Sequence, residues 1–119
     1  MGIEKKFWQG KRVFITGHTG FKGTWLCLCL QMLGAEVSGY ALEPPTHPNL
    51  FELCGASRLV LSNHGDVRDY RSMSMCLNSF RPEIVIHMAA QPLGRESYIN
   101  PAETYEVNVM GTVNLLEAI

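Results

Sequence analysis

Three glycines in the stretch FITGHTGFKG, at Gly17, Gly20 and Gly23, have types and spacing that suit phosphate binding. Their G-x-x-G-x-x-G spacing is one residue wider than the G-x-G-x-x-G fingerprint of dinucleotide-binding turns. Gly17 can take backbone angles that a Cβ forbids, Gly20 lets a pyrophosphate come close, and Gly23 allows close packing on the first helical turn. Exposed N–H groups at a helix start also favour an anion. The stretch therefore predicts a dinucleotide-binding turn.

Other side chains that suit chemistry stand near the ends of later predicted strands. Asp66 either accepts a hydrogen bond from an adenine amino group or serves as a local turn residue. Lys22 either adds charge near the phosphates or is a solvated surface lysine. His87 is interpreted as a packed strand histidine in preference to a catalytic base. Gln91 could meet the substrate side of the cofactor.

The cysteines and histidines do not form a metal-binding pattern. Cys27, Cys29, Cys54 and Cys76 include no C-x-x-C pair, and the four histidines are scattered. We expect reduced, packed thiols and no metal site.

Charge and hydropathy exclude several classes of partner. With a formal net charge of −1 over 119 residues, the chain offers no electrostatic footprint for nucleic acid or an anionic membrane. It has no signal-peptide pattern, and its longest apolar run is too short to span a bilayer. We expect one cytoplasmic domain with no nucleic-acid and no membrane partner.

The first half of the chain contains the elements that must position the glycine turn. A buried strand is predicted at 13–16 and a helix at 24–33, whose residues at helical spacing are Trp25, Leu26, Cys29, Leu30 and Leu33. A second strand is predicted at 36–42. A loop with one helical turn at Leu50–Leu53 follows.

The second half continues the alternation. A third strand lies within 58–67, and Asp69 is expected to cap a helix that Pro82 stops. The inward face of that helix is predicted to hold Tyr70, Met73, Leu77 and Phe80. The segment 83–89 is apolar on both faces, as in a central parallel strand. Asn100 and Pro101 are expected to start the last helix.

The element order predicts an α/β fold, a Rossmann-like doubly wound parallel sheet of about four strands with helices on both faces. In the last helix Val107, Met110, Val113, Leu116 and Ile119 continue an apolar stripe to the final residue. A doubly wound sheet would normally place another strand next. We therefore interpret residues 1–119 as the N-terminal part of a dinucleotide-binding Rossmann domain.

Four motifs together, TGHTGFKG, GDVRD, HMAAQP and NVMGTVNLLEA, resemble the extended short-chain dehydrogenase/reductase superfamily and its NAD-dependent epimerase/dehydratase branch. The opening FWQGKRVFITGHTGFKGTWL, with GYALEPPT and PEIVIHMAAQPL, looks more narrowly like the CDP-glucose 4,6-dehydratases. The resemblance covers essentially the whole chain. It implies an NAD-dependent lyase that removes water from a nucleotide sugar in bacterial deoxysugar and lipopolysaccharide biosynthesis, working as a homo-oligomer.

The same resemblance implies the site. Adenine is held by Asp66 and Val67, and Asn108 organises the site. The residues that would flank the ribose and nicotinamide are Ala89, Ala90 and Gln91. Those that would line the pyrophosphate are Thr16, Gly17, His18, Thr19, Gly20, Phe21, Lys22 and Gly23.

The resemblance also implies a reaction that this chain cannot complete. Hydride leaves C4 of the sugar for NAD, the C4 ketone acidifies the C5 proton, water leaves from C5 and C6, and hydride returns to C6. The superfamily moves the protons with a Tyr-x-x-x-Lys pair, and neither Tyr98 nor Tyr105 is followed by a lysine four residues later. We expect no catalytic residue in this chain, from which the substrate subdomain is also absent.

Several alternatives stay open. The end of the second predicted strand, at Ala41–Glu43, does not decide between NAD and NADP. A related epimerase or a GDP-mannose-type dehydratase would share fold and cofactor. A non-catalytic dinucleotide-binding module and an unstable remnant of a disrupted gene are the further possibilities.

Overall fold

A computed structural model describes residues 5–42, 50–53, 55, 59–89, 102 and 106–119 of the chain. Its sheet has four parallel strands: β1 (Arg12–Thr16), β2 (Glu36–Ala41), β3 (Leu61–His64) and β4 (Ile84–His87). Their order is β3-β2-β1-β4, so the chain moves outward in one direction from β1 and then returns to its other side. The Rossmann-like parallel sheet predicted above is confirmed.

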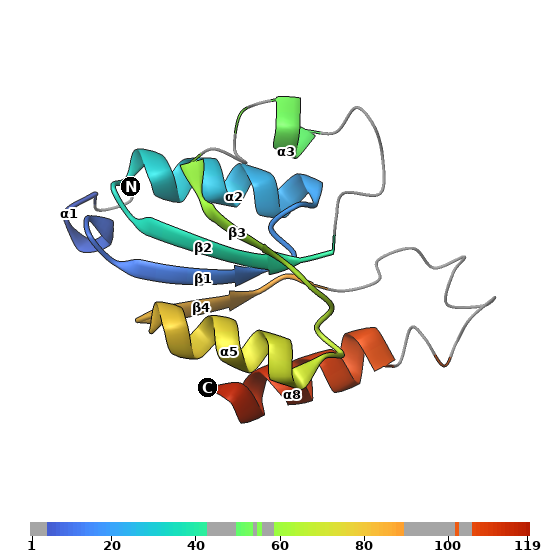
Figure 1. Cartoon of the computed structure of the whole chain (residues 1–119). Helices are drawn as coiled ribbons and strands as arrows, with labels where there is room; N and C mark the ends of the chain where they lie inside the picture. The colour runs from blue at the N-terminus through green and yellow to red at the C-terminus, as the bar shows by residue number, and fades with distance from the viewer. Residues whose placement is uncertain (1–4, 43–49, 54, 56–58, 90–101, 103–105) are drawn as a thin grey trace.

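The helices form a layer on each face of this sheet (Figure 1). Helix α2 (Phe21–Met32) and the short α3 (Leu50–Leu53) cover one face. Helix α5 (Tyr70–Phe80) and the terminal pair η1 (Glu106–Met110) and α8 (Gly111–Ala118) cover the other. A short helix that the sequence did not predict, α1 (Lys5–Trp8), lies near the amino ends of the strands. No helix in the described part of the chain has the length and apolarity that a membrane crossing needs.

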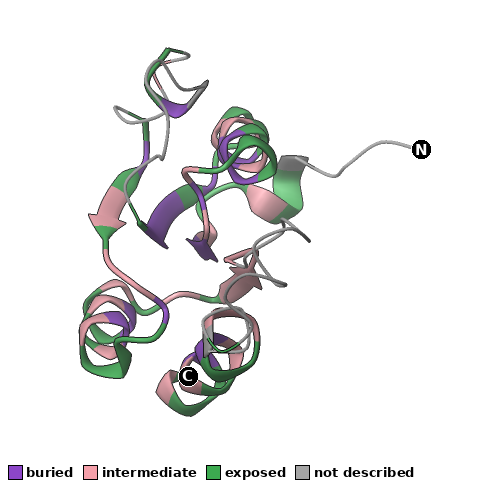
Figure 2. Cartoon of the chain, turned by 90° about the vertical axis from the view of Figure 1, so that its right-hand side faces the viewer, coloured by how far each residue is buried: buried purple, intermediate pink, exposed green. Residues whose placement is uncertain are grey.

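Each layer encloses its own apolar core because successive strand residues point to opposite faces. Val13 and Ile15 of β1 pack under α2, whereas Phe14 packs under α5 and α8. Figure 2 shows the buried residues gathered on the strands and on the inward sides of the helices. Strand register brings two polar residues together: in the parallel pair β1–β4, Thr16 lies opposite His87.

Helix α5 begins and ends as predicted. Asp69 accepts a hydrogen bond from the Ser72 N–H at 3.2 Å, and Arg81 ends the helix in the left-handed conformation (φ 52°) before Pro82. Met73 and Leu77 are buried, but the prediction was wrong for Tyr70, which is 43% exposed. Tyr70 is the first residue of the helix and lies beyond the edge of the core it was expected to fill.

The residues that recur at helical spacing in α2 do not all face the core. Trp25 is 49% exposed and Cys29 is exposed, whereas Cys27 and Leu30 are buried. Helix α2 has a single charged residue, Lys22, and is apolar around its whole circumference. Apolar periodicity therefore cannot select its buried face.

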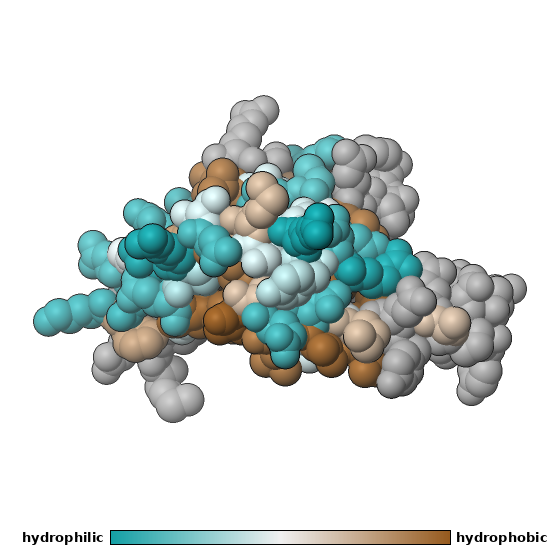
Figure 3. Space-filling view, turned by 60° about the horizontal axis from the view of Figure 1, so that its bottom comes forward, coloured by the Kyte–Doolittle hydropathy of each residue, from teal (hydrophilic) through white to brown (hydrophobic). Residues whose placement is uncertain are grey.

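The apolar stripe of the last helix is largely exposed and is not the part of the helix that enters the core. Met110, Val113, Leu116 and Ile119 are exposed, and Gly111 and Leu115 are buried instead. Residues three apart are displaced by roughly 300° around a helix, so a strict spacing of three winds around the axis. Figure 3 brings the α5 and α8 side of the molecule forward and shows hydrophilic and hydrophobic residues side by side there.

Strand β4 was expected to be central, but its four residues are half-buried and its described pairing is with β1 alone. Within the described residues it is thus the edge of the sheet. The expected helix start at Asn100 and Pro101 lies outside them.

Candidate functional site

A cleft of about 580 Å³ opens at the carboxyl ends of the strands, where β1 lies between β2 and β4. In open α/β sheets, ligands bind at this point because the strand order reverses there. The volume is within the usual range for ligand pockets. The described residues that line the cleft are Gly17, Thr19, Gly20, Phe21, Lys22, Gly23, Ala41, Leu42, Gly65, Asp66, Val67, Met88, Ala89 and Val107.

Gly17 makes the turn that leads from β1 to α2. Its φ is +79°, a conformation that side chains rarely adopt, and its N–H donates to the Tyr40 carbonyl at 2.9 Å. A Cβ here would lie 2.8 Å from the backbone N of Ala89 and the carbonyl carbon of Met88. Gly17 therefore allows the turn to form, and it also lets the backbone after β4 pack against the turn.

Gly20 precedes the first turn of α2 in extended conformation (φ −74°, ψ 174°) and provides no side-chain cap. A Cβ at Gly20 would meet only the Gly17 carbonyl oxygen, at an ordinary 3.6 Å, so the space beside it opens into the cleft. The first N–H groups of a helix lack partners within the helix. An uncapped helix start facing an open cleft suits an anionic group.

Gly23 allows α2 to approach the turn itself. A Cβ there would lie 2.8 Å from the His18 Cα and would collide with the Gly17 carbonyl oxygen. The close packing predicted for this glycine therefore involves the backbone of Gly17 and His18.

The side chain of His18 lies in the protein interior and does not line the cleft. Its ring is fully buried over Gly39, its Nε2 is 2.7 Å from the Ser62 Oγ, and its Nδ1 is buried without a hydrogen-bond partner. Burial, with a smaller contribution from the charge of His64, lowers the pKa of His18 to about 4. The imidazole is neutral at pH 7, so any role of His18 at a pyrophosphate is limited to its backbone.

Thr16 is also buried and is not among the residues that line the cleft. The hydroxyl lies 2.6 Å from the His87 Nδ1 and accepts from the N–H groups of Met88 and Ala89 at 3.1 and 3.2 Å. Thr16 therefore supports the wall of the cleft and does not itself form the surface.

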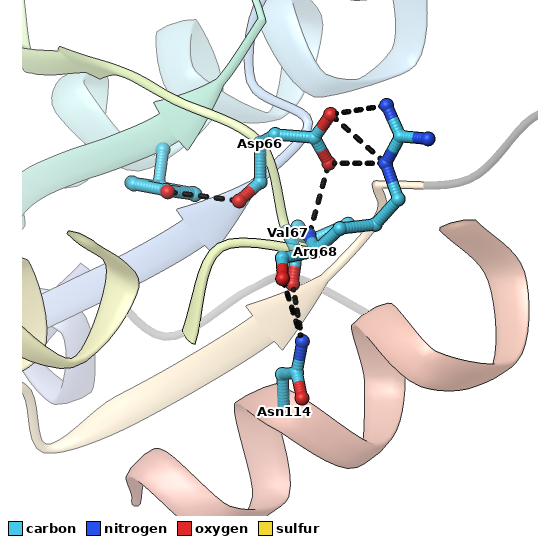
Figure 4. A network of polar contacts seen from close by, with 5 residues as sticks. Asp66, Val67, Arg68 and Asn114 are labelled. Atoms are coloured by element: carbon cyan, nitrogen blue, oxygen red, sulfur yellow. Dashed lines mark hydrogen bonds and ion pairs between the residues drawn. The ribbon is translucent and has the colours of Figure 1, made fainter. Parts of the chain in front are cut away.

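Asp66 lines the far end of the cleft, where its carboxylate is paired with Arg68 (Figure 4). The Arg68 guanidinium donates to both carboxylate oxygens, at 2.6 Å to Oδ2 and 3.0 Å to Oδ1, and the Arg68 N–H donates to Oδ1 at 2.9 Å. These hydrogen bonds from Arg68 lower the pKa of Asp66 below its ordinary value. Asp66 thus has the local role that was one of its two predicted roles, and it also lines the cleft, where adenine binding by Asp66 stays a prediction.

Neighbouring elements hold this loop from two sides. The Tyr40 hydroxyl of β2 donates to the Asp66 carbonyl at 2.9 Å. The Asn114 amide of α8 donates to the carbonyls of Val67 and Arg68 at 3.1 and 3.2 Å, as Figure 4 shows. Sequence reasoning did not single out Asn114, because no local pattern joins it to a loop 47 residues earlier in the chain.

Two further polar residues lie at the mouth of the cleft. The Thr19 hydroxyl donates to the Leu42 carbonyl at 3.0 Å and so joins the turn to the end of β2. Lys22 is exposed in the first turn of α2, and among the described lining residues only Lys22 and Asp66 are charged. The described residues contain no group of three potential metal ligands.

The structure therefore brings together the glycine turn, Thr19, Phe21, Lys22, Asp66, Val67 and Ala89 around one cleft. Asn108 is half-buried in η1 and does not line it. Ala90 and Gln91 lie outside the described residues. The sequence did not single out Gly65, Met88 or Val107 as lining residues, because their places in the cleft depend on how the strand ends and η1 meet.

A family model and curated proteins match nearly the whole of this chain. A family model described as GDP-mannose 4,6 dehydratase matches residues 14–119. CDP-glucose 4,6-dehydratase of Salmonella typhimurium is 59% identical over 98% of this chain, which covers 33% of that protein. The chain thus spans about a third of the length of this relative and of dTDP-L-rhamnose 4-epimerase of Burkholderia thailandensis, to which it is 32% identical.

Solved structures share the fold. UDP-glucose 4-epimerase of Thermus thermophilus, in complex with NAD, matches 90% of this chain with a TM-score of 0.78 and 33% identity. The NAD complex of UDP-glucose 4-epimerase from Brucella ovis matches 92% with a TM-score of 0.78 and 29% identity. This chain covers 33% and 32% of those chains.

Proposed function

The chain belongs to the GDP-mannose 4,6 dehydratase family, and from that premise we propose that it is the NAD-binding part of a nucleotide-sugar dehydratase that acts on CDP-glucose. The observation that carries the cofactor proposal is the cleft beside Gly20. There an uncapped helix start, an open space and a nearby lysine meet at the point where the strand order reverses.

The residues of the cleft fit the parts of a dinucleotide in order. The turn at Gly17–Gly23 suits the pyrophosphate, because it offers backbone N–H groups with no side chain in the way. The loop at Asp66 and Val67 suits adenine, with a buried Val67 as its apolar contact. Ala89, packed on Gly17, suits the nicotinamide half. The cofactor, when bound, supplies the hydride acceptor and donor.

The sugar-nucleotide proposal rests on sequence similarity. The Salmonella CDP-glucose 4,6-dehydratase is 59% identical, whereas the GDP-mannose 4,6-dehydratase of Vibrio cholerae is 30% identical over a similar stretch. We accordingly favour CDP-glucose over the other sugar nucleotides. From the family resemblance we also propose a cytoplasmic homo-oligomer that serves deoxysugar and lipopolysaccharide synthesis.

The role of this chain in the reaction is to bind and orient. Its described residues hold the cofactor at the carboxyl edge of the sheet and keep the imidazoles of His18 and His87 directed away from it. Proton transfer requires a positioned acid and base. The 119 residues include no Tyr-x-x-x-Lys pair.

Calorimetric titration with NAD and with NADP tests the cofactor proposal. We expect saturable binding of NAD, with NADP weaker by at least about tenfold. Binding of neither dinucleotide would overturn the proposal.

The substrate is tested with the longest available protein whose sequence includes these 119 residues. We expect release of a 4-keto-6-deoxy sugar nucleotide from CDP-glucose and no product from GDP-mannose or UDP-glucose. Turnover of GDP-mannose alone, or epimerisation of UDP-glucose, would contradict it, and NAD binding without any turnover would favour a binding module.

A further inference from the structure

A chain of hydrogen bonds crosses the molecule from β1 to the last helix through His87. The Thr16 hydroxyl lies 2.6 Å from the His87 Nδ1, and the His87 Nε2 lies 3.0 Å from the Thr112 hydroxyl of α8. The Thr112 hydroxyl donates to the Asn108 carbonyl at 2.9 Å. This series of hydrogen bonds thus joins β1, β4, α8 and η1.

The direction of every bond in this chain follows from counting donors and acceptors. A threonine hydroxyl has one donor and two acceptor positions. Both acceptor positions of Thr16 are filled, because the N–H groups of Met88 and Ala89 can only donate. The Thr16 O–H must therefore donate to the His87 Nδ1, which leaves the ring proton on Nε2.

The remaining contacts agree with this tautomer. The Thr112 O–H is already directed at the Asn108 carbonyl, so the Thr112 oxygen is left to accept from the His87 Nε2–H. Burial lowers the pKa of His87, and a neutral ring is the only form that keeps both bonds. A second proton on Nδ1 would face the Thr16 O–H and displace one of its partners.

This chain of hydrogen bonds reaches the cleft through two backbone N–H groups, those of Met88 and Ala89. Ala89 lines the cleft and packs on Gly17, and its N–H donates to the Thr16 hydroxyl. Met88 also lines the cleft, and its N–H is shared between the Thr16 carbonyl at 3.0 Å and the hydroxyl at 3.1 Å. A contact that holds the Thr16 side chain in one rotamer therefore also holds Met88 and Ala89 in place at the cleft.

We propose that His87, as its Nε2-protonated neutral tautomer, is a positioning residue that holds the Met88–Ala89 wall of the dinucleotide cleft in register with helix α8. Its effect on cofactor binding rests on the proposed function. His87 itself does not line the cleft and acts through Thr16 on one side and Thr112 on the other.

Thr112 provides the sharpest test because it lies outside the cleft lining and, among the described residues, its hydroxyl joins His87 to the Asn108 carbonyl. Thr112→Val keeps the side-chain shape and removes the hydroxyl, whereas Thr112→Ser keeps the hydroxyl. We expect Thr112→Val to weaken NAD binding about five- to tenfold and Thr112→Ser to restore it. A purely steric role of Thr112 would give the opposite order.

The tautomer is read directly by nitrogen NMR of protein labelled with ¹⁵N-histidine, with His87→Asn identifying the His87 signals. We expect a protonated Nε2 and a non-protonated Nδ1 at pH 7.5, and slower hydrogen exchange of the Ala89 amide in the wild type than in Thr112→Val.

A ring protonated at Nδ1, or equal NAD affinity for Thr112→Val and the wild type, would overturn the proposal. If the wild type does not bind NAD, the proposed function fails, and the tautomer together with Ala89 exchange still decides whether His87 positions this wall.

Discussion

At the scale of single residues, Gly17 carries two separate constraints that an alanine would violate together. Its backbone is left-handed (φ +79°), and a Cβ would lie 2.8 Å from the backbone after β4. Gly10 shares the first constraint alone, since its φ is +77° and nothing lies within 4 Å of an added Cβ. The two positions can therefore separate backbone strain from collision.

We predict that Gly10→Ala lowers the free energy of unfolding by about 1 kcal/mol and Gly17→Ala by about 3 kcal/mol or more. The measurement is urea denaturation of both variants beside the wild type. Equal losses would mean that the contact between Gly17 and Met88–Ala89 does not limit the structure.

His18 makes stability depend on pH. Its folded pKa, lowered by burial to about 4, lies below the value of about 6.5 expected when unfolded. The unfolded chain therefore gains a proton first as the pH falls below about 6.5, which favours unfolding.

We predict that this group contributes stability in full above pH 6.5 and that up to about 3 kcal/mol is lost between pH 6.5 and 4. His18→Phe removes this contribution, so urea denaturation of the two proteins across this range gives the difference. His87 shifts in the same sense and is present in both proteins, so it cancels. Parallel curves would contradict the assignment.

At the scale of elements, helix α8 supports the Asp66 end of the cleft through Asn114. Its amide donates to two backbone carbonyls of the loop that carries Asp66. The same helix reaches the opposite wall through Thr112 and His87. One helix thus organises both ends of the cleft without lining it.

We predict that Asn114→Ala lowers the free energy of unfolding by about 1–2 kcal/mol and weakens NAD binding several-fold, because two loop carbonyls lose their donor. Asn78→Ala is the matched control, since Asn78 is exposed on α5. Calorimetry and urea denaturation measure both quantities. Identical behaviour of the two variants would show that the loop holds its shape without α8.

The sequence predicted the elements better than it predicted their buried faces. Glycine positions, the Asp69 cap and β-branched runs are local signals, and they located β1, α2, β2 and α5 closely. The faces of α2 and α8 depend on which neighbour covers them, which local sequence does not contain. Thr16 meets His87 because of strand register, which again is a tertiary property.

At the scale of the whole molecule, we expect cofactor binding and turnover to be separable. The cleft is assembled within 119 residues, which are about a third of the length of the Salmonella relative. These residues do not include the Tyr-x-x-x-Lys pair that the family resemblance implies for catalysis.

We predict that the 119-residue chain binds NAD but forms no 4-keto product from CDP-glucose, because its sequence contains no Tyr-x-x-x-Lys pair to move the substrate protons. The check is a product assay with stoichiometric protein, in which even a single turnover is visible. Turnover at a rate comparable to that of a full-length dehydratase would show that another residue of this chain takes the role of the tyrosine–lysine pair.

The central claim, that the cleft beside Gly20 binds the cofactor's pyrophosphate, is tested most directly by titrating NAD into the wild type and Gly20→Ala. An alanine at this position has room and an ordinary φ of −74°, so folding should lose at most about 1 kcal/mol. Its methyl group would project into the cleft, and we predict an NAD affinity at least about tenfold weaker in a variant that urea denaturation shows to be folded. Equal affinity of the two proteins, or no saturable binding by the wild type, would contradict the account.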